Sequence, residues 1–248
     1  MDIDYSLHYK KYHDDTDAHY ATTAKFVLRL LAPVLATLPE DAKIMDIGCG
    51  TGLLVNALQV TGYRQVRGID ISQHQILGAQ ERRLPCEVVG RDYVYELAKT
   101  APRSLDAVFL MDVLEHLEVE EQIKFLRATC QLIRPDGCLV ASVPNANSSF
   151  AMRWRYADWT HRTSFTEQSL DFVLRNAGFV AVTFHPYEFG TRPTFPYLHK
   201  ASFWVSALRS LFRLARRMEA IAELGRKGLS IPLSLNLLVE ARTNHEVV

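Results

Sequence analysis

The feature that most constrains this chain is a glycine-rich loop that directly follows a short apolar run. The run KIMDI at 43–47 leads into Gly48-Cys49-Gly50-Thr51-Gly52, and helical spacing begins after it. Glycine lacks the Cβ that would keep a ligand away from the backbone, and it tolerates positive φ. The N-terminus of the following helix favours an anionic group. The segment therefore predicts a strand, a ligand-binding turn and a helix.

The rest of the chain alternates apolar runs with helix-period segments, which is typical of a parallel sheet whose crossover helices cover both faces. We expect strands at 43–47, 66–70, 86–89, 105–111, 137–143, 179–184 and 233–241. Helices are expected at 52–61, 73–83, 93–100 and 119–132, and a further one capped by Thr166, with Ser169 where a capping box would have Glu. A turn at 134–136 and a long aromatic-rich loop at 144–165 complete the pattern.

The length of 248 residues suits one α/β domain with an insertion. We expect a lid and leading helix at 1–42, a Rossmann-like core at 43–185, a helical insertion at 186–231, and the last strand and tail at 232–248.

Charge and composition exclude several other classes. The 28 basic residues balance the 28 acidic ones, so no global field favours nucleic acid, and an N/D-P-P-Y/F stretch is missing after the fourth strand. No run approaches the ~20 apolar residues of a spanning helix. The four cysteines form no CxxC pair and are interpreted as buried thiols. These features predict a cytoplasmic protein.

The glycine spacing identifies the ligand class. A dinucleotide loop would place its third glycine where Leu53 stands, whereas here the pattern is D-x-G-x-G-x-G from Asp46. This pattern resembles motif I of the class I S-adenosylmethionine-dependent methyltransferases. The resemblance covers 43–185 and implies a seven-stranded methyltransferase sheet. It also implies a cofactor site made by Asp46, Gly48, Cys49, Gly50, Gly52, Asp70, Ile71, Asp92, Tyr93 and Met111. Asp70 would take both ribose hydroxyls, unless it is merely a helix cap. Asp92 has the same simpler alternative.

A cluster of ionisable residues follows the fourth strand, where Asp112, Glu115 and His116 lie within five positions. The segment is similar to the E-x-x-E-H sequence of ubiquinone-type and small-RNA 2′-O-methyltransferases, with Asp112 in place of Glu. A later histidine in those families corresponds to His161. The resemblance implies a divalent cation such as Mg²⁺ held by Asp112, Glu115, His116 and His161. Alternatively, His116 is a general base or acceptor contact, with Asp112 and His161 as further catalytic residues. His161 is otherwise a loop residue that orders the nearby aromatic residues.

Two segments point to the acceptor. The aromatic residues Trp154, Tyr156 and Trp159 form either a ring-binding platform or the core of a cap. Residues 203–222 form a basic amphipathic helix that carries Arg209, Arg213, Arg216 and Arg217. That helix either packs as a cap or dimer element, or lies peripherally on the inner membrane.

The whole arrangement looks like methyltransferases of bacterial surface-polysaccharide clusters. We therefore expect O-methylation of a saccharide, such as a lipid-linked precursor of surface polysaccharide. The alternatives are a quinone-like phenol or another small molecule as acceptor, or a cofactor-binding module without catalysis.

Overall fold

A computed structural model describes residues 16–187 and 201–244 of the chain. Its centre is a seven-stranded sheet in the order β3-β2-β1-β4-β5-β7-β6. The strands are β1 (Lys43–Ile47), β2 (Gln65–Asp70), β3 (Cys86–Val88), β4 (Leu105–Met111), β5 (Ile133–Pro144), β6 (Ala181–His185) and β7 (Asn236–Arg242). The first five pair in parallel, and β7 runs antiparallel to both β5 and β6. This arrangement confirms the predicted methyltransferase sheet.

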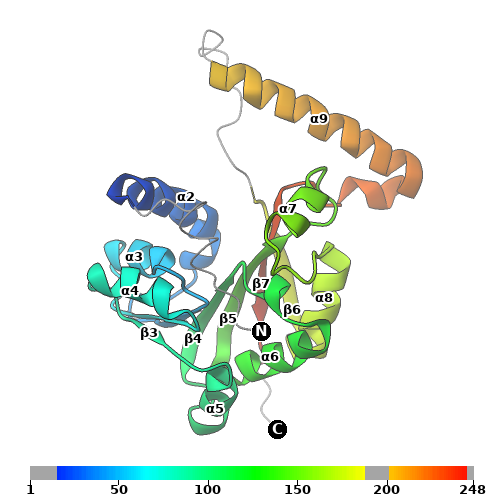
Figure 1. Cartoon of the computed structure of the whole chain (residues 1–248). Helices are drawn as coiled ribbons and strands as arrows, with labels where there is room; N and C mark the ends of the chain where they lie inside the picture. The colour runs from blue at the N-terminus through cyan, green and yellow to red at the C-terminus, as the bar shows by residue number, and fades with distance from the viewer. Residues whose placement is uncertain (1–15, 188–200, 245–248) are drawn as a thin grey trace.

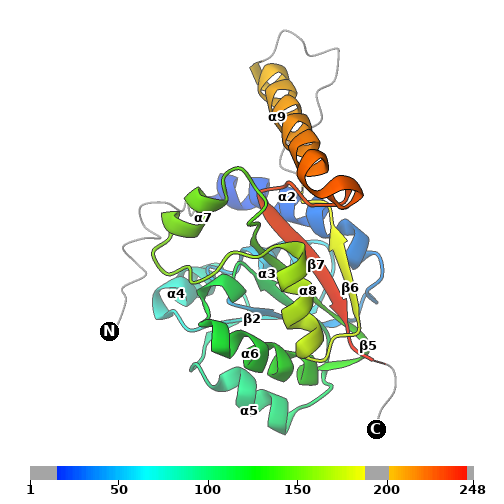
Figure 2. The ribbon, with the colours of Figure 1, turned by 90° about the vertical axis from the view of Figure 1, so that its right-hand side faces the viewer.

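Helices cover both faces of the sheet (Figures 1 and 2). One buried cluster includes Leu126 and Leu170, while a second includes Leu31 and Leu58. The first cluster lies under α5 (Tyr93–Thr100), α6 (Val119–Leu132) and α8 (Glu167–Asn176), and the second under α2 (Asp17–Leu35), α3 (Leu53–Val60) and α4 (Gln73–Glu81). Each crossover helix returns the chain to the same end of the sheet, so that β1 to β5 run parallel. Because these helices lie on different faces of the sheet, they form two layers.

The turn expected at 134–136 lies within a strand. β5 begins at Ile133, which pairs with Leu105, and the register shifts before Ala107 pairs with Cys138. Asp136 has φ 67°, and a Cβ on Gly137 would stand 2.7 Å from the Asp106 carbonyl oxygen. The turn residues therefore bend the strand without ending it.

The segment expected to be a loop at 144–165 contains a short helix, α7 (Ala151–Ala157). The following helix, α8, has a complete capping box. Thr166 Oγ1 accepts from Ser169 N, and Ser169 Oγ accepts from Thr166 N. A serine hydroxyl thus replaces the glutamate that a full capping box was expected to need.

The basic helix is α9 (Ala201–Leu224), followed by η3 (Gly225–Leu229). It extends away from the sheet in Figure 1, and Trp204, Leu211 and Met218 are each more than half exposed. Of the described helices, none is long and apolar enough to cross a membrane. The start of the expected lid, residues 1–15, lies outside the described part of the chain.

Candidate functional site

The glycine loop joins β1 to α3 and has two kinds of glycine. Gly48 and Gly52 have φ 76° and 80°, and a Cβ there would lie 2.5 Å from Val113 Cγ2 and 2.7 Å from Leu84 Cδ1. At Gly50, φ is 54° and the nearest atom to such a Cβ is Gln75 Oε1 at 3.5 Å. Gly48 and Gly52 are therefore required by packing, whereas Gly50 leaves room for a ligand at the backbone.

Asp70 ends β2 and is tied to this loop. Its Oδ2 accepts from Gly50 N at 2.9 Å, and its Oδ1 accepts from Ser72 N at 2.8 Å. Burial raises the pKa of Asp70, although these backbone N–H groups oppose the rise. The N-cap of α4 is Ser72, whose hydroxyl accepts from Gln75 N. Asp70 is thus not merely the cap of that helix, and its two oxygens are fixed beside the glycine loop.

Asp46 lies on β1 and is almost completely buried. Its Oδ1 has no hydrogen-bond partner among the described residues. Burial, with a smaller contribution from Asp70, raises the pKa of Asp46 to about 8. A buried carboxyl oxygen without a hydrogen-bond partner raises the free energy of the folded protein unless a ligand supplies the missing interaction. Beside the open backbone at Gly50, it fits a cofactor that carries positive charge, such as S-adenosylmethionine.

The other residues expected at the cofactor site differ in exposure. Cys49 is buried within the loop, and Ile71 is 49% exposed directly after Asp70. Asp92 is exposed at the N-cap of α5 without a side-chain cap hydrogen bond. Tyr93 and Met111 are half-buried. An exposed isoleucine beside the ribose-binding candidate offers an apolar surface for a base.

His116 lies at the end of η1 (Leu114–His116), close to the glycine loop through Val113. Its Nδ1 is 2.8 Å from Thr160 Oγ1, and the Thr160 hydroxyl donates to Asp158 Oδ1 at 2.6 Å. Since that hydroxyl has a single proton, it accepts from His116 Nδ1–H, which makes Nε2 the basic nitrogen of the neutral ring.

Asp158 is the anchor of this hydrogen-bonded chain. Burial opposes its ionisation, but two hydrogen bonds from Thr160 and the nearby imidazoles hold the pKa of Asp158 below its usual value. An ionised carboxylate at the end of the chain favours a proton on His116. Neither Asp158 nor Thr160 was expected from the sequence to be functional, although the D-W-T-H stretch at 158–161 places a carboxylate and a hydroxyl beside a histidine.

His161 packs edge-on to His116 with the ring centroids 4.7 Å apart. Its Nδ1 lies 2.8 Å from the Trp154 carbonyl oxygen. Glu115, His116 and His161 each place one potential metal-ligating atom within 4.8 Å of the others. Glu115 is buried and its Oε2 lacks a hydrogen-bond partner among the described residues. Burial, and then Asp112, raise the pKa of Glu115 well above its usual value.

Asp112 does not join this group of three. It has φ 57°, and its Oδ1 accepts from Ser142 Oγ and Asn236 Nδ2, both at 2.9 Å. Burial raises the pKa of Asp112 to about 6. The left-handed backbone gives Asp112 partners on β5 and β7. Asp112 is therefore not among the residues that could share a metal ion, which are Glu115, His116 and His161.

Three aromatic residues of the segment at 144–165, which contains α7 and is called the α7 segment below, lie on the surface. Trp154, Tyr156 and Trp159 are 40%, 65% and 87% exposed. The interpretation of these residues as the core of a cap is therefore wrong, and a surface for an acceptor ring remains.

Comparisons with known proteins agree with this arrangement. A family described as a methyltransferase domain matches residues 18–183. The ubiquinone biosynthesis O-methyltransferase of Neisseria meningitidis serogroup A is 31% identical over 109 residues, which are 42% of this chain and 45% of that protein. The enzyme of the same name from Chromobacterium violaceum is 36% identical over 110 residues, 43% of this chain and 46% of that protein. The aligned segments thus span about half the length of these curated relatives.

Among solved structures, a SAM-dependent methyltransferase from Archaeoglobus fulgidus superposes with a TM-score of 0.65 at 20% identity, covering 96% of this chain and 99% of that one. This likeness concerns the fold. The family match spans most of the chain and includes the glycine loop, Asp70 and the His116 segment. The chain therefore belongs to the methyltransferase domain family, as a class I S-adenosylmethionine-dependent member distantly related to the ubiquinone biosynthesis O-methyltransferases.

Proposed function

We propose that this protein transfers a methyl group from S-adenosylmethionine to a hydroxyl oxygen of a small-molecule acceptor, with His116 as the group that receives the hydroxyl proton. The observation that carries the proposal is the Asp158–Thr160–His116 hydrogen-bonded chain. Val113, three residues before His116, contacts the glycine loop at Gly48. The segment that carries His116 therefore packs on the proposed cofactor loop through Val113.

The cofactor would be held by the open backbone at Gly50, by Asp70 toward the ribose, by Asp46 toward the positive charge and by Ile71 under the base. When bound, S-adenosylmethionine supplies a methyl group whose bond to sulfur breaks as the bond to the acceptor oxygen forms, the electron pair staying on sulfur. The chain's own task is to position the acceptor, and such positioning can lower the barrier by ~7–11 kcal/mol.

His116 completes the proton balance. The hydroxyl proton passes to Nε2, and the resulting imidazolium keeps its Nδ1–H on Thr160. The anionic Asp158 stabilises that positive charge through the threonine hydroxyl. General base catalysis of this kind contributes about 10²–10⁴-fold in rate.

For the acceptor we favour a phenol of the quinone-precursor type over a saccharide. The curated relatives are named for ubiquinone biosynthesis, and the exposed aromatic residues of the α7 segment suit either ring. The saccharide and its place in polysaccharide synthesis stay expectations from sequence resemblance.

Glu115, His116 and His161 support a second candidate mechanism, in which they hold a divalent cation. One carboxylate and two imidazoles suit a first-row cation or Mg²⁺ with added water or acceptor oxygens. The buried Glu115 carboxyl would lose its proton to the solvent on binding. The cation would lower the pKa of the acceptor hydroxyl and orient it.

The test is incubation with isotopically labelled S-adenosylmethionine and separate catechol, quinone-precursor and cell-envelope saccharide fractions, followed by mass spectrometry of the products. We expect a labelled methyl ether from the phenols and loss of product in His116→Gln, with S-adenosylhomocysteine binding retained. Excess EDTA distinguishes the mechanisms, because full activity with EDTA excludes the cation. Cofactor binding without any product would instead show a non-catalytic module.

A further inference from the structure

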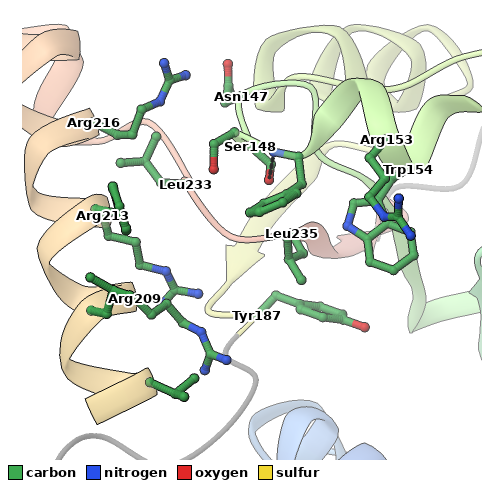
Figure 3. Close-up of a pocket in the computed structure, with 15 residues that line it drawn as sticks. Asn147, Ser148, Arg153, Trp154, Tyr187, Arg209, Arg213, Arg216, Leu233 and Leu235 are labelled. Atoms are coloured by element: carbon green, nitrogen blue, oxygen red, sulfur yellow. Dashed lines mark hydrogen bonds between the residues drawn. The ribbon is translucent and has the colours of Figure 1, made fainter.

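A pocket of about 690 Å³ separates α9 from the α7 segment. One wall comes from the turn at 147–150 and from Arg153 and Trp154 of α7. The facing wall is α9, and Leu233 and Leu235 before β7 form the floor with Tyr187 (Figure 3). The residues of both walls and of the floor follow β5 in the sequence, and none of them belongs to the glycine loop.

The pocket is strongly positive although the chain as a whole is neutral. Arg153, Arg209, Arg213 and Arg216 line it, and the described lining residues include no carboxylate. Arg216 also pairs with Glu219 at 2.8 Å. Among the described residues, no carboxylate pairs with Arg153 or Arg213. Guanidinium groups bind phosphate and carboxylate through paired hydrogen bonds, so this lining selects an anion.

The same pocket is apolar between its arginines. Val205, Leu208 and Phe212 recur at three- and four-residue spacing on the face of α9 that carries Arg209, Arg213 and Arg216. Phe212 is 62% exposed, and Phe150 on the opposite wall is 57% exposed. Large apolar side chains facing one another across a positive pocket suit a ligand with an anionic group on an apolar body.

The pocket adjoins the proposed reaction site. Trp154 lines it, and the carbonyl oxygen of the same residue contacts His161 Nδ1. Its walls are also held together by the buried Asn145. The Asn145 Nδ2 donates to the carbonyl oxygens of Pro232 and Ser234 at 2.9 and 2.8 Å, while its Oδ1 accepts from Asn147 N. The pocket is therefore a built part of the acceptor side.

We propose that the pocket between α7 and α9 binds the anionic group of an amphiphilic methyl acceptor, a phosphate or carboxylate joined to an apolar or aromatic body, whose hydroxyl then reaches His116. This inference rests on the proposed function for the acceptor role, whereas the anion site itself can be measured without turnover.

The experiment titrates octyl phosphate, below its micelle concentration, into the protein saturated with S-adenosylhomocysteine, using calorimetry. Octyl glucoside serves as the neutral probe with the same tail. We expect the phosphate probe to bind at least tenfold more tightly than the glucoside, because a charged hydrogen bond contributes that much or more.

Arg213→Gln and Arg153→Gln should each weaken octyl phosphate binding about tenfold and leave glucoside binding unchanged. Arg226→Gln is the matched control, because Arg226 is an exposed arginine of η3 outside the pocket lining. All three variants should bind S-adenosylhomocysteine as the parent does, which shows that the fold and the cofactor site are intact.

Equal binding of the two probes, or parental phosphate binding in both pocket variants, would overturn the anion site. Vesicles of phosphatidylglycerol separate the two sources of the anion. If the vesicles bind through Arg153 and Arg213 while monomeric octyl phosphate does not, the surface is a membrane contact and the acceptor pocket is wrong. Octyl phosphate binding here, together with no methylated product in the labelling experiment with S-adenosylmethionine and the acceptor fractions, would leave the anion site and overturn the proposed function.

Discussion

The buried carboxyl of Asp46 should make cofactor binding depend steeply on pH. In the ligand-free protein its pKa is raised to about 8 by burial and by Asp70. A cofactor with a positive charge near this carboxyl favours the carboxylate, so the pKa falls on binding. Binding therefore releases a proton, and a higher pH favours the complex until Asp46 is already ionised in the free protein, near pH 8.

The magnitude follows from the ionised fraction of Asp46. With a pKa of about 8, about one molecule in ten is ionised at pH 7 and about one in a hundred at pH 6. The dissociation constant of S-adenosylmethionine, which keeps the positive sulfonium, should fall nearly tenfold from pH 6 to pH 7, which is about 1.4 kcal/mol. Above pH 8 the dependence should flatten.

Calorimetric titration at constant ionic strength measures this dependence. Two buffers with different ionisation enthalpies give the number of protons released, which should be close to one at pH 7. The Asp46→Asn side chain cannot ionise, so the pH dependence of the dissociation constant should be weaker in this variant. Any dependence that is left would come from Asp70, whose pKa is also raised by burial. A dissociation constant that stays level from pH 6 to 8 in the parent, with no proton released, would refute the reasoning.

Substitutions at four further positions test other parts of the site. Gly48→Ala should destabilise the fold by ~2–5 kcal/mol in urea unfolding, because left-handed strain adds to the clash with Val113. Gly50→Ala should cost only the ~1–2 kcal/mol of strain but should weaken cofactor binding more than Gly48→Ala does. A larger loss of stability at Gly50, or a larger loss of cofactor binding at Gly48, would contradict the assignment of Gly48 to packing and Gly50 to the ligand. Thr160→Val should lower kcat about tenfold to a hundredfold with little change in KM, while Thr160→Ser retains activity; equal activity of the two variants would remove the hydrogen-bonded chain from the mechanism. Asp70→Ala should weaken S-adenosylhomocysteine binding by ~1.5–3 kcal/mol for each charged hydrogen bond lost, and unchanged binding would show the ribose assignment to be wrong.

The fold could be predicted closely because its signals are local. The run at 43–47 and the helix at 119–132 have the bounds expected from sequence, since glycine turns and apolar periodicity mark their ends. The start of β5 was harder to predict from the sequence. The residues at 134–136 are typical of a turn, but the same residue types also occur where a strand bends. Only pairing with Leu105 shows that Ile133 already belongs to the sheet.

The candidate site was predictable where its residues are neighbours in the sequence. The glycine loop is contiguous, and Asp70 follows from its place at the end of the next strand. By contrast, the contact between His116 and Thr160 joins residues 44 positions apart. The orientation of Asp112 depends on a left-handed backbone that an aspartate adopts infrequently. Residue spacing and composition predict neither the contact between His116 and Thr160 nor the orientation of Asp112.

This difference has a physical origin in the order of the chain. The proposed cofactor residues lie on β1 to β4, where short parallel crossovers bring successive strand ends to one edge of the sheet. The proposed acceptor residues come largely from segments after β5, where the chain makes α7, α9 and the antiparallel β7. Asn145 joins these segments across 87 and 89 residues through its bonds to Pro232 and Ser234. Changes after β5 can therefore alter the acceptor while the cofactor loop stays the same, which explains why the sequence identifies the methyl donor class more sharply than the acceptor.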